Sequence, residues 1–252
     1  MRSIAGAALL LVSAGAHAAW SVSADLEAFK WKEDGTPAVE ETGPRWGASW
    51  GYLHERDQGW QWAYRGQFRR GTINYEGAFL FSGQPTAART RYTGLLNELQ
   101  GIYRLGGSQG IELLGGLGLD YWERNILPDQ KEDYGVVFAR LGLNVDPRSS
   151  RGLFAGFGLK LPFYVAENAH LDELGFDRNE TLHPKGNLSA YGQVGYRFQR
   201  RWSLIGYYDG YRFGESKTVT TTSAAFPGTQ FLIFQPASKV DSFGIKLQYD
   251  FK

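Results

Sequence analysis

The sequence predicts an all-β chain that folds into a single ten-stranded antiparallel transmembrane β-barrel, with long extracellular loops and short periplasmic turns. Three observations support this prediction. Apolar and polar residues alternate along most of the chain, as in strands with one apolar face. The alternating segments have about ten residues or more, whereas strands of soluble proteins usually have about 5–6 and membrane-spanning strands about 9–11. The connections are alternately long and short, as in transmembrane barrels.

Ten segments show the alternation. In one of them Leu113, Leu117 and Leu119 alternate with polar positions that include Glu112 and Asp120, so the leucines share one face and the acids the other. The predicted strands cover approximately residues 20–31, 44–55, 60–81, 87–105, 111–121, 137–145, 153–163, 187–198, 202–213 and 240–251. A twelve-stranded barrel is the alternative.

The short connections are rich in turn-forming residues such as glycine, aspartate and serine. They cover residues 56–59, 106–110, 146–152 and 199–201. Because the strand count is even, both termini are expected on the side of these short turns. Arg104 and Glu112 are equidistant from the centre of the 106–110 turn, so we expect them to face each other across a hairpin.

The first 18 residues are typical of a secretory signal peptide. Arg2 precedes an apolar stretch from Ile4 to Ala16, and Ala16-His17-Ala18 forms a small-residue cleavage site. This stretch is too short to cross the ~30 Å hydrocarbon core as a helix. We therefore expect residues 1–18 to be removed on export and residues 19–252 to form the barrel.

The composition excludes several function classes. The chain has 27 Lys and Arg residues against 26 Asp and Glu residues, whereas nucleic-acid binding needs a clustered excess of positive charge. There is no cysteine, so disulfide scaffolds, thiolate zinc sites and thiol nucleophiles are excluded.

Aromatic residues collect near the ends of the predicted strands. Amphipathic rings settle where a membrane meets water, so transmembrane barrels carry an aromatic girdle at each interface. Trp31 and Tyr134 are assigned to the girdle on the side of the long loops. The other residues predicted at the two interfaces are Trp20, Trp46, Tyr52, Trp60, Tyr103, Tyr121, Phe163, Trp202, Tyr249 and Phe251.

The face opposite the apolar one is rich in glycine and charge, which a lipid-facing surface does not accommodate. Ten strands enclose a narrow bore, because barrel diameter grows with strand number. Two interpretations stay open: a narrow polar channel that favours anions, since the predicted cations outnumber the acids, or a charge network packed across the lumen. The predicted lumen-lining residues are Arg65, Arg69, Glu98, Arg104, Glu112, Asp120, Arg140, Lys160, Arg197, Asp209 and Lys246.

Together these features resemble the outer-membrane β-barrel superfamily of Gram-negative bacteria. The last predicted strand, Val240 to Phe251, is similar to the C-terminal assembly signal of that superfamily, except that Lys252 follows the final aromatic residue. The resemblance implies location in the outer membrane, contact with its lipids and lipopolysaccharide, and insertion by the barrel-assembly machinery. It implies no cofactor, and no closer subfamily is recognised.

The fourth long loop holds a candidate cation-binding or rim site. Two imidazoles and four carboxylates lie close together there, and such groups bind divalent cations or pair as a base with its orienting acid. Their spacing matches no helical zinc motif, and a solvated acidic loop is the alternative. The six residues are His170, Asp172, Glu173, Asp177, Glu180 and His183.

The strand count also resembles that of omptins, the surface proteases of this superfamily, whose activity needs an acidic pair and an Asp-His pair at the outer rim. The sequence has no Asp-x-Asp or Asp-x-His segment, so this resemblance carries no catalytic residues over. Asp120 and Asp209 are expected at rim height, where His170 or His183 can lean over them. Lipid-modifying barrels need a Ser-His unit, and the strand histidine His54 lies at the wrong end for a lipid of the outer leaflet.

The leading functional prediction is a non-enzymatic barrel, either a narrow polar channel or a plugged barrel that acts through its surface loops. A rim-located hydrolase is the alternative. The last long connection, 214–238, is expected to form an extended hairpin with Pro227-Gly228 in a type II turn. Its segment 231–234 is expected either to be an exposed binding surface or to fold inward or against the hairpin near residues 79–81.

Overall fold

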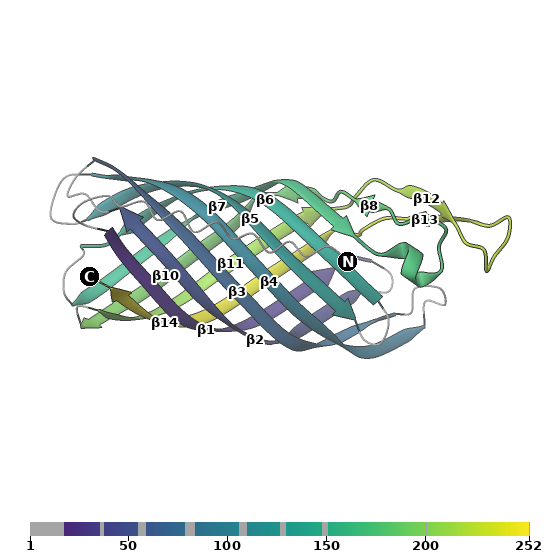
Figure 1. Cartoon of the computed structure of the whole chain (residues 1–252), viewed down its shortest axis with the longest axis horizontal. Coiled ribbons are helices and arrows are strands. Elements are labelled where there is room, and N and C mark those ends of the chain that lie inside the picture. Colours follow the sequence, from purple (N-terminus) through teal and green to yellow (C-terminus); the bar gives the residue numbers. More distant parts are fainter. Residues whose placement is uncertain are drawn as a thin grey trace.

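Ten long antiparallel strands form a closed barrel in the computed structural model, which describes residues 18–35, 38–54, 59–78, 84–105, 110–126, 130–147, 151–199 and 201–251 (Figure 1). Neighbouring long strands are hydrogen-bonded, and the pairings of β1 with β14 and of β7 with β10 close the sheet on itself. The prediction of a ten-stranded antiparallel barrel is confirmed. Apart from Ala18, the predicted signal peptide lies outside the described residues.

The ten strands of the barrel wall are joined to smaller elements at one end. β8 (Thr181–Leu182) and β9 (Lys185–Asn187) extend the sheet beside β7 and β11, and a short 3-10 helix covers Leu171–Leu174. Within the described residues no helix has the length and apolar character needed to cross a membrane. The wall strands are β1 (Ala18–Glu33), β2 (Val39–His54), β3 (Gly59–Ala78), β4 (Pro85–Arg104), β5 (Ile111–Ile126), β6 (Gln130–Val145), β7 (Gly152–Asn168), β10 (Ser189–Gln199), β11 (Trp202–Gly214) and β14 (Ser238–Phe251).

The strands run further toward the long-connection end than the sequence predicts. β5 continues to Ile126 and β6 begins at Gln130, although a long connection was expected between residues 121 and 137. The side chains still alternate between buried and exposed positions there, but the polarity of the two faces is exchanged. The alternation of apolar and polar residues is therefore harder to read in these segments, and the expected boundaries are wrong.

One end of the barrel wall carries an outward-facing apolar band. On β6 the outward side chains from Val137 to Val145 are apolar, and on β5 those from Leu113 to Tyr121 are apolar or glycine. Each of these segments is nine residues long, which matches the ~9–11 residues of a membrane-spanning strand. Leu141, at the middle of its segment, is 71% exposed. Exposed apolar surface of this extent marks a region that contacts lipid or protein.

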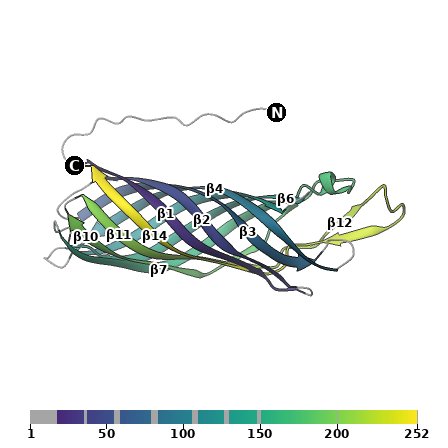
Figure 2. The ribbon, with the colours of Figure 1, turned by 90° about the horizontal axis from the view of Figure 1, so that it is seen from below.

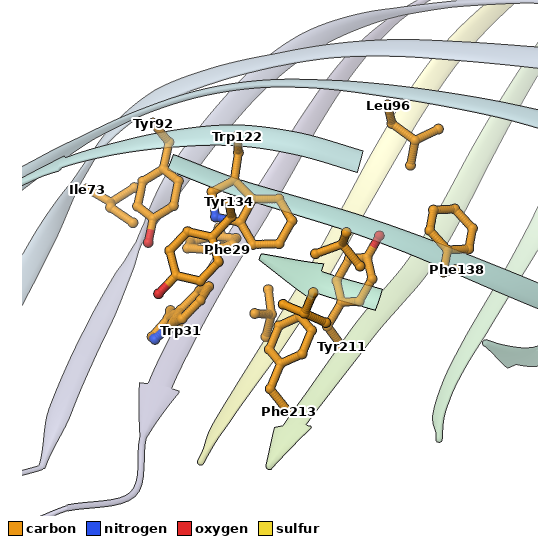
Figure 3. Packing of buried hydrophobic residues seen from close by; sticks show 13 residues of the cluster. Phe29, Trp31, Ile73, Tyr92, Leu96, Trp122, Tyr134, Phe138, Tyr211 and Phe213 are labelled. Carbon is orange, nitrogen blue, oxygen red and sulfur yellow. The ribbon is translucent and has the colours of Figure 1, made fainter. Parts of the chain in front are cut away.

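Beyond the band the polarity of the wall is reversed. On β1 the outward residues change to Lys30 and Lys32, while the inward residues change from Asp25 to Phe29 and Trp31. The inward aromatic and aliphatic side chains of this half form one buried cluster (Figure 3). This half of the barrel is therefore built like a soluble β-protein, with an apolar core and a polar exterior.

The aromatic residues predicted at the interfaces lie in the wall as cross-strand pairs. Trp20 packs on Tyr52 with ring centroids 4.9 Å apart, and Trp202 packs on Tyr249 at the same distance. Trp60 and Tyr103 are 5.2 Å apart. The remaining predicted residues, Trp46, Tyr121, Phe163 and Phe251, are exposed on the outer surface.

Two further aromatic assignments are wrong. Trp31 and Tyr134 do not face outward at the loop-side interface, because both are buried inside the barrel with exposed fractions of 0% and 1%. Each belongs to an inward-facing set of its strand, Trp31 with Asp25 and Phe29 on β1 and Tyr134 with Val136 on β6. Position near a strand end indicated an interface, but the parity of the strand decides which way the ring points.

A small hairpin projects beyond the loop end of the barrel (Figure 2). It consists of β12 (Val219–Thr222) and β13 (Gln230–Ile233), which pair antiparallel. The backbone N–H of Thr229 donates to the carbonyl of Phe226 at 3.1 Å, and Gly228 has φ +78°. A positive φ at the third residue is the requirement of a type II turn, so the predicted hairpin and its turn are confirmed.

Candidate functional site

The inward faces of the wall hold all the charged residues predicted to line the lumen. The alternation of inward and outward positions along each strand places these residues on the inner face of the wall, where their ion-pair partners also lie. Seven of them, Arg69, Glu98, Glu112, Asp120, Arg140, Lys160 and Lys246, are buried, and four, Arg65, Arg104, Arg197 and Asp209, are partly buried.

Ion pairs near the turn end connect parts of the wall, one across a single hairpin and one across an intervening strand. Arg104 and Glu112 lie opposite each other in register, and their side chains meet at 3.2 Å, which confirms the predicted cross-hairpin pair. Arg197 reaches both carboxylate oxygens of Asp146, each at 3.2 Å. A bidentate contact of this kind fixes the orientation of the guanidinium and also compensates its charge.

A charge network crosses the barrel at mid-height. Arg140 donates to Glu98 at 3.1 Å, and Lys160 is paired with Asp209. The second oxygen of Asp209 lies 3.9 Å from both Arg65 and Arg140. Because these residues come from β3, β4, β6, β7 and β11, the network ties opposite walls together.

Small residues make room for large ones in this layer. The guanidinium of Arg140 lies over the ring of Tyr191, 3.7 Å from its centroid. The hydroxyl end of Tyr191 occupies the space that a Cβ would fill at Gly142 and at Gly158. Alanine at Gly142 would displace this ring, and alanine at Gly158 would also meet the backbone carbonyl of Leu141.

Asp120 lies in the interior and not at the outer rim, where the sequence placed it. It is paired with Arg69 and accepts a hydrogen bond from the hydroxyl of Tyr211 at 2.8 Å. It is fully buried. The reason is that β5 continues six residues past Asp120 to Ile126, so the residue lies well inside the wall.

An aromatic layer, formed by inward-facing rings from several strands, lies across the barrel (Figure 3). It lies on the loop-end side of the charge network. Trp122 stacks on Tyr134 at 5.1 Å with an interplanar angle of 9°, and Trp31 contacts the same Tyr134 edge-on at 5.2 Å. On the opposite wall, Tyr211 and Phe213 of β11 stack on each other, with ring centroids 5.6 Å apart. Interiors packed with side chains at this density leave little free cross-section.

Two cations pack against the rings of the aromatic layer on its turn-end side. The guanidinium of Arg45 lies 3.7 Å from the ring centroid of Phe29, and it is also paired with Glu27 at 2.6 Å. The Lys160 ammonium lies 3.4 Å from the ring centroid of Tyr211. Cation–π contacts of buried groups are worth ~2 kcal/mol, so the charged and aromatic layers stabilise each other.

On the loop-end side of the aromatic rings, three carboxylates converge on Arg124. Its guanidinium lies 2.5 Å from Glu132, 3.1 Å from Glu33 and 3.1 Å from Glu41. Glu167 is buried beside them, and one of its oxygens has no hydrogen-bond partner among the described residues. Four buried carboxylates surround one guanidinium, so acidic groups outnumber the cation in this cluster.

The six residues of the predicted loop site are not gathered around one point. His170 pairs with Asp133 of β6 at 2.7 Å and faces Glu173 at 3.6 Å. His183 bonds to the backbone carbonyl of Val165 at 2.9 Å. In the part of the chain that the structure describes, no three His, Asp or Glu side chains are arranged to hold a metal ion.

The rest of that loop is tied to the projecting hairpin. Asp177 receives the Thr222 hydroxyl at 2.5 Å, and its backbone N–H donates to the Thr222 carbonyl at 2.8 Å. Asp172 and Glu173 lie in the first turn of the 3-10 helix and are exposed, and Glu180 is partly exposed. The acidic residues of this loop therefore either stabilise its fold through hydrogen bonds or contact solvent.

The four residues of the hydrolase alternative are not brought together. Asp120 and Asp209 are held in ion pairs inside the barrel, whereas His170 and His183 are engaged on the loop. Both ring nitrogens of His170 face carboxylates, so neither is directed at a water molecule over the barrel mouth. The expected assembly of an Asp–His unit from these residues does not occur.

One side of the hairpin packs inward, and the other is exposed. Phe231 and Ile233 pack against the cluster of Leu171 and Phe176, with the rings of Phe231 and Phe176 at 5.3 Å. Leu232 is 69% exposed, and Phe226 and Phe234 are exposed as well. The predicted exposure is thus found for Leu232 and Phe234, whereas Phe231 and Ile233 pack against the fourth long loop, a placement that the sequence did not predict. Residues 79–81, the proposed packing partner, lie outside the described residues.

Comparison with known proteins gives a likeness of fold. No protein-family model matches the chain, and no curated protein matches its sequence. Among solved structures, the outer membrane protease OmpT from Escherichia coli is similar with a TM-score of 0.50 and 13% identity, over 93% of this chain and 96% of that one. The transport unit of the autotransporter AIDA-I from Escherichia coli has a TM-score of 0.47 and 10% identity, over 96% and 92% of the two chains.

The chain has the fold of the Gram-negative outer-membrane β-barrels. No closer subfamily is established by these likenesses.

Sequence reasoning missed several residues of this barrel interior. Arg45 and Arg124 were not assigned to the lumen, and the acids that surround Arg124 were taken as parts of long connections or left unassigned. Extending the parity of β2 from Ser49 to Arg45, and that of β5 from Asp120 to Arg124, places both arginines inside. The signal was present, but the aromatic residues between these charges concealed it.

Replacement of Arg124 by methionine is expected to destabilise the folded barrel by about 3–5 kcal/mol, because it leaves buried carboxylates without their counter-charge. Replacement of Lys30 by methionine is the control, since Lys30 and Glu40 form an exposed pair, and such pairs contribute about 0–1 kcal/mol. Reversible unfolding by denaturant in lipid vesicles measures both. Equal effects of the two substitutions would contradict the role given to Arg124.

Proposed function

We propose that this protein is an integral outer-membrane β-barrel whose interior is closed to solutes and which acts through the surface at its loop end. The apolar band supports the membrane assignment. Its residues face outward on neighbouring strands, its segments have membrane-spanning length, and the fold is that of outer-membrane barrels. The reversal of polarity beyond the band then marks where the wall leaves the lipid.

The single observation that carries the closed interior is the pair of layers across the lumen. The charge network of Arg140 and Lys160 lies directly below the aromatic layer of Trp122, Tyr134 and Tyr211. A conducting pore needs a continuous polar path, and the buried rings interrupt it. Filling of the lumen by the wall's own side chains therefore favours the plugged barrel over the narrow channel.

The projecting hairpin supports the second half of the proposal. It is held by hydrogen bonds and by packing of Phe231 on the loop cluster, so it is an ordered structure at the end of the barrel (Figure 2). Leu232 and Phe234 are exposed on its other side. Exposed apolar residues on an ordered projection are typical of an interaction surface.

A charge placed in the middle of the apolar band tests the membrane assignment. Replacement of Leu141 by arginine is expected to lower the free energy of unfolding in lipid vesicles by about 2–4 kcal/mol, the cost of an arginine facing lipid at mid-depth. Arginine at Thr72, which faces outward on β3 beyond the band, is the control and should change it by no more than about 0.5 kcal/mol. In a barrel exposed to water both replacements would be nearly neutral.

Planar-bilayer recordings test the closed interior. The wild-type protein is expected to give no conductance steps at any salt concentration, because the aromatic layer interrupts the path. Steps that disappear when Arg65 or Arg140 is reversed in charge would show that the lumen conducts, and the channel interpretation would replace the plugged one.

Single cysteines test the orientation, since the chain has none of its own. Cysteine at Ala225 in the hairpin is expected to react with a membrane-impermeant maleimide on intact cells. Cysteine at Pro147, exposed at the turn end, should react only after the outer membrane is permeabilised. The reverse pattern would place the hairpin in the periplasm and overturn the proposal of a cell-surface role.

A further inference from the structure

A polar cavity of about 300 Å³ lies in the turn-end half of the barrel, below the mid-height charge network. Ala19, Tyr52 and Asp250, at the ends of their strands, line its lower part. Arg65, Arg140 and Asp209 of the charge network line its upper part. The cavity is therefore reached from the turn end and is closed above by the network and the aromatic layer.

The charged groups that line the cavity are balanced in number but not equally well paired. Its cations are Arg65, Arg140, Arg197 and Lys246, and its carboxylates are those of Glu112, Asp146, Asp209 and Asp250. Arg197 reaches both oxygens of Asp146 at 3.2 Å, and Arg140 lies 3.1 Å from Glu98. These groups lie in the half of the barrel whose outer surface is apolar, where solvent screening is weak.

Arg65 is the group that lacks a close partner. Its nearest carboxylate oxygens belong to Asp209 at 3.9 Å and Glu98 at 4.0 Å. The other guanidinium groups of the interior are held more tightly, as shown by Arg45 at 2.6 Å and Arg140 at 3.1 Å from their carboxylates. The Arg65 side chain is 28% exposed and lines the cavity. Its loosely paired guanidinium is therefore accessible there.

Two further cations adjoin Arg65 at the cavity. Lys246 lies 3.2 Å from the Ser49 hydroxyl and 3.6 Å from Asp25, and the positive charge of Arg65 acts on it. Arg140 is 3% exposed, and its Nε has no partner in the described part of the chain. Arg65, Arg140 and Lys246, from β3, β6 and β14, thus face one cavity from different sides of the barrel.

We propose that this cavity is a binding site for a small oxyanion, a carboxylate or a phosphate, held mainly by Arg65 with Lys246 and Arg140 beside it. The planar fork of a guanidinium matches two oxygens of such a group. Bound there, the anion supplies the close partner that the Arg65 guanidinium lacks. The site faces the turn end, so it is separate from the loop-end surface on which the proposed function rests.

Titration of the purified barrel in a zwitterionic detergent tests this proposal. Sodium phosphate and sodium acetate are added in separate series, with sodium chloride keeping the ionic strength constant, and binding is followed by calorimetry and by the thermal midpoint. Saturable binding of at least one of the two oxyanions is expected, and the series that responds identifies phosphate or carboxylate as the ligand class.

Substitutions locate the site. Arg65→Gln should weaken binding about tenfold or more, the size expected when charge-assisted hydrogen bonds are lost, and Lys246→Gln should weaken it less. Arg70→Gln is the matched control, because Arg70 lies on the same strand but faces outward beyond the band. Absence of saturable binding to both anions, an equal effect of chloride alone, or unchanged affinity in Arg65→Gln would each overturn the proposal.

Discussion

The two faces of the barrel wall exchange polarity once along its length, and the rest of the structure depends on that exchange. Over the nine residues from Val137 to Val145, the outward side chains are apolar, and Arg140 and Asn144 point into the lumen. Beyond that segment the outward side chains are polar, as the proposed membrane position requires, since only a face that meets lipid must be apolar. The positions of the polar lumen, the aromatic layer and the projecting loops along the barrel all follow from this exchange.

Charges in the lumen are arranged so that most have a close partner. Arg69 with Asp120, Arg140 with Glu98 and Arg124 with its three glutamates show how complete the pairing is. Burial of such groups is costly unless each is compensated, so a narrow barrel with many inward charges must be closely matched. The two departures, Arg65 with too few partners and Glu167 with too many like charges, lie on either side of the aromatic layer.

The strand number, the antiparallel order, the Arg104–Glu112 pair and the β12–β13 hairpin could be predicted from the sequence, because period-two alternation and turn residues are local signals. The strand ends at Ile126 and Gln130 could not be read in the same way. There the inward face mixes Trp122 and Tyr134 with Arg124, and neither face is uniformly apolar. Assignment of Trp31 to a membrane interface failed for the same reason. Which carboxylate meets which arginine depends on register across non-neighbouring strands, and no local pattern contains that information.

The cluster around Arg124 joins strands that are far apart in the chain, since two of its carboxylates come from β1 and β2. Glu132 faces Arg124 across the β5–β6 hairpin, but Glu33 and Glu41 have no counter-charge until the sheet has curved far enough to bring β1 and β2 near β5. A half-rolled sheet would hold desolvated carboxylates with nothing to neutralise them. Intermediates of closure are therefore high in free energy, and the last stage of folding is expected to be cooperative, with the cylinder either open and hydrated at this level or fully shut.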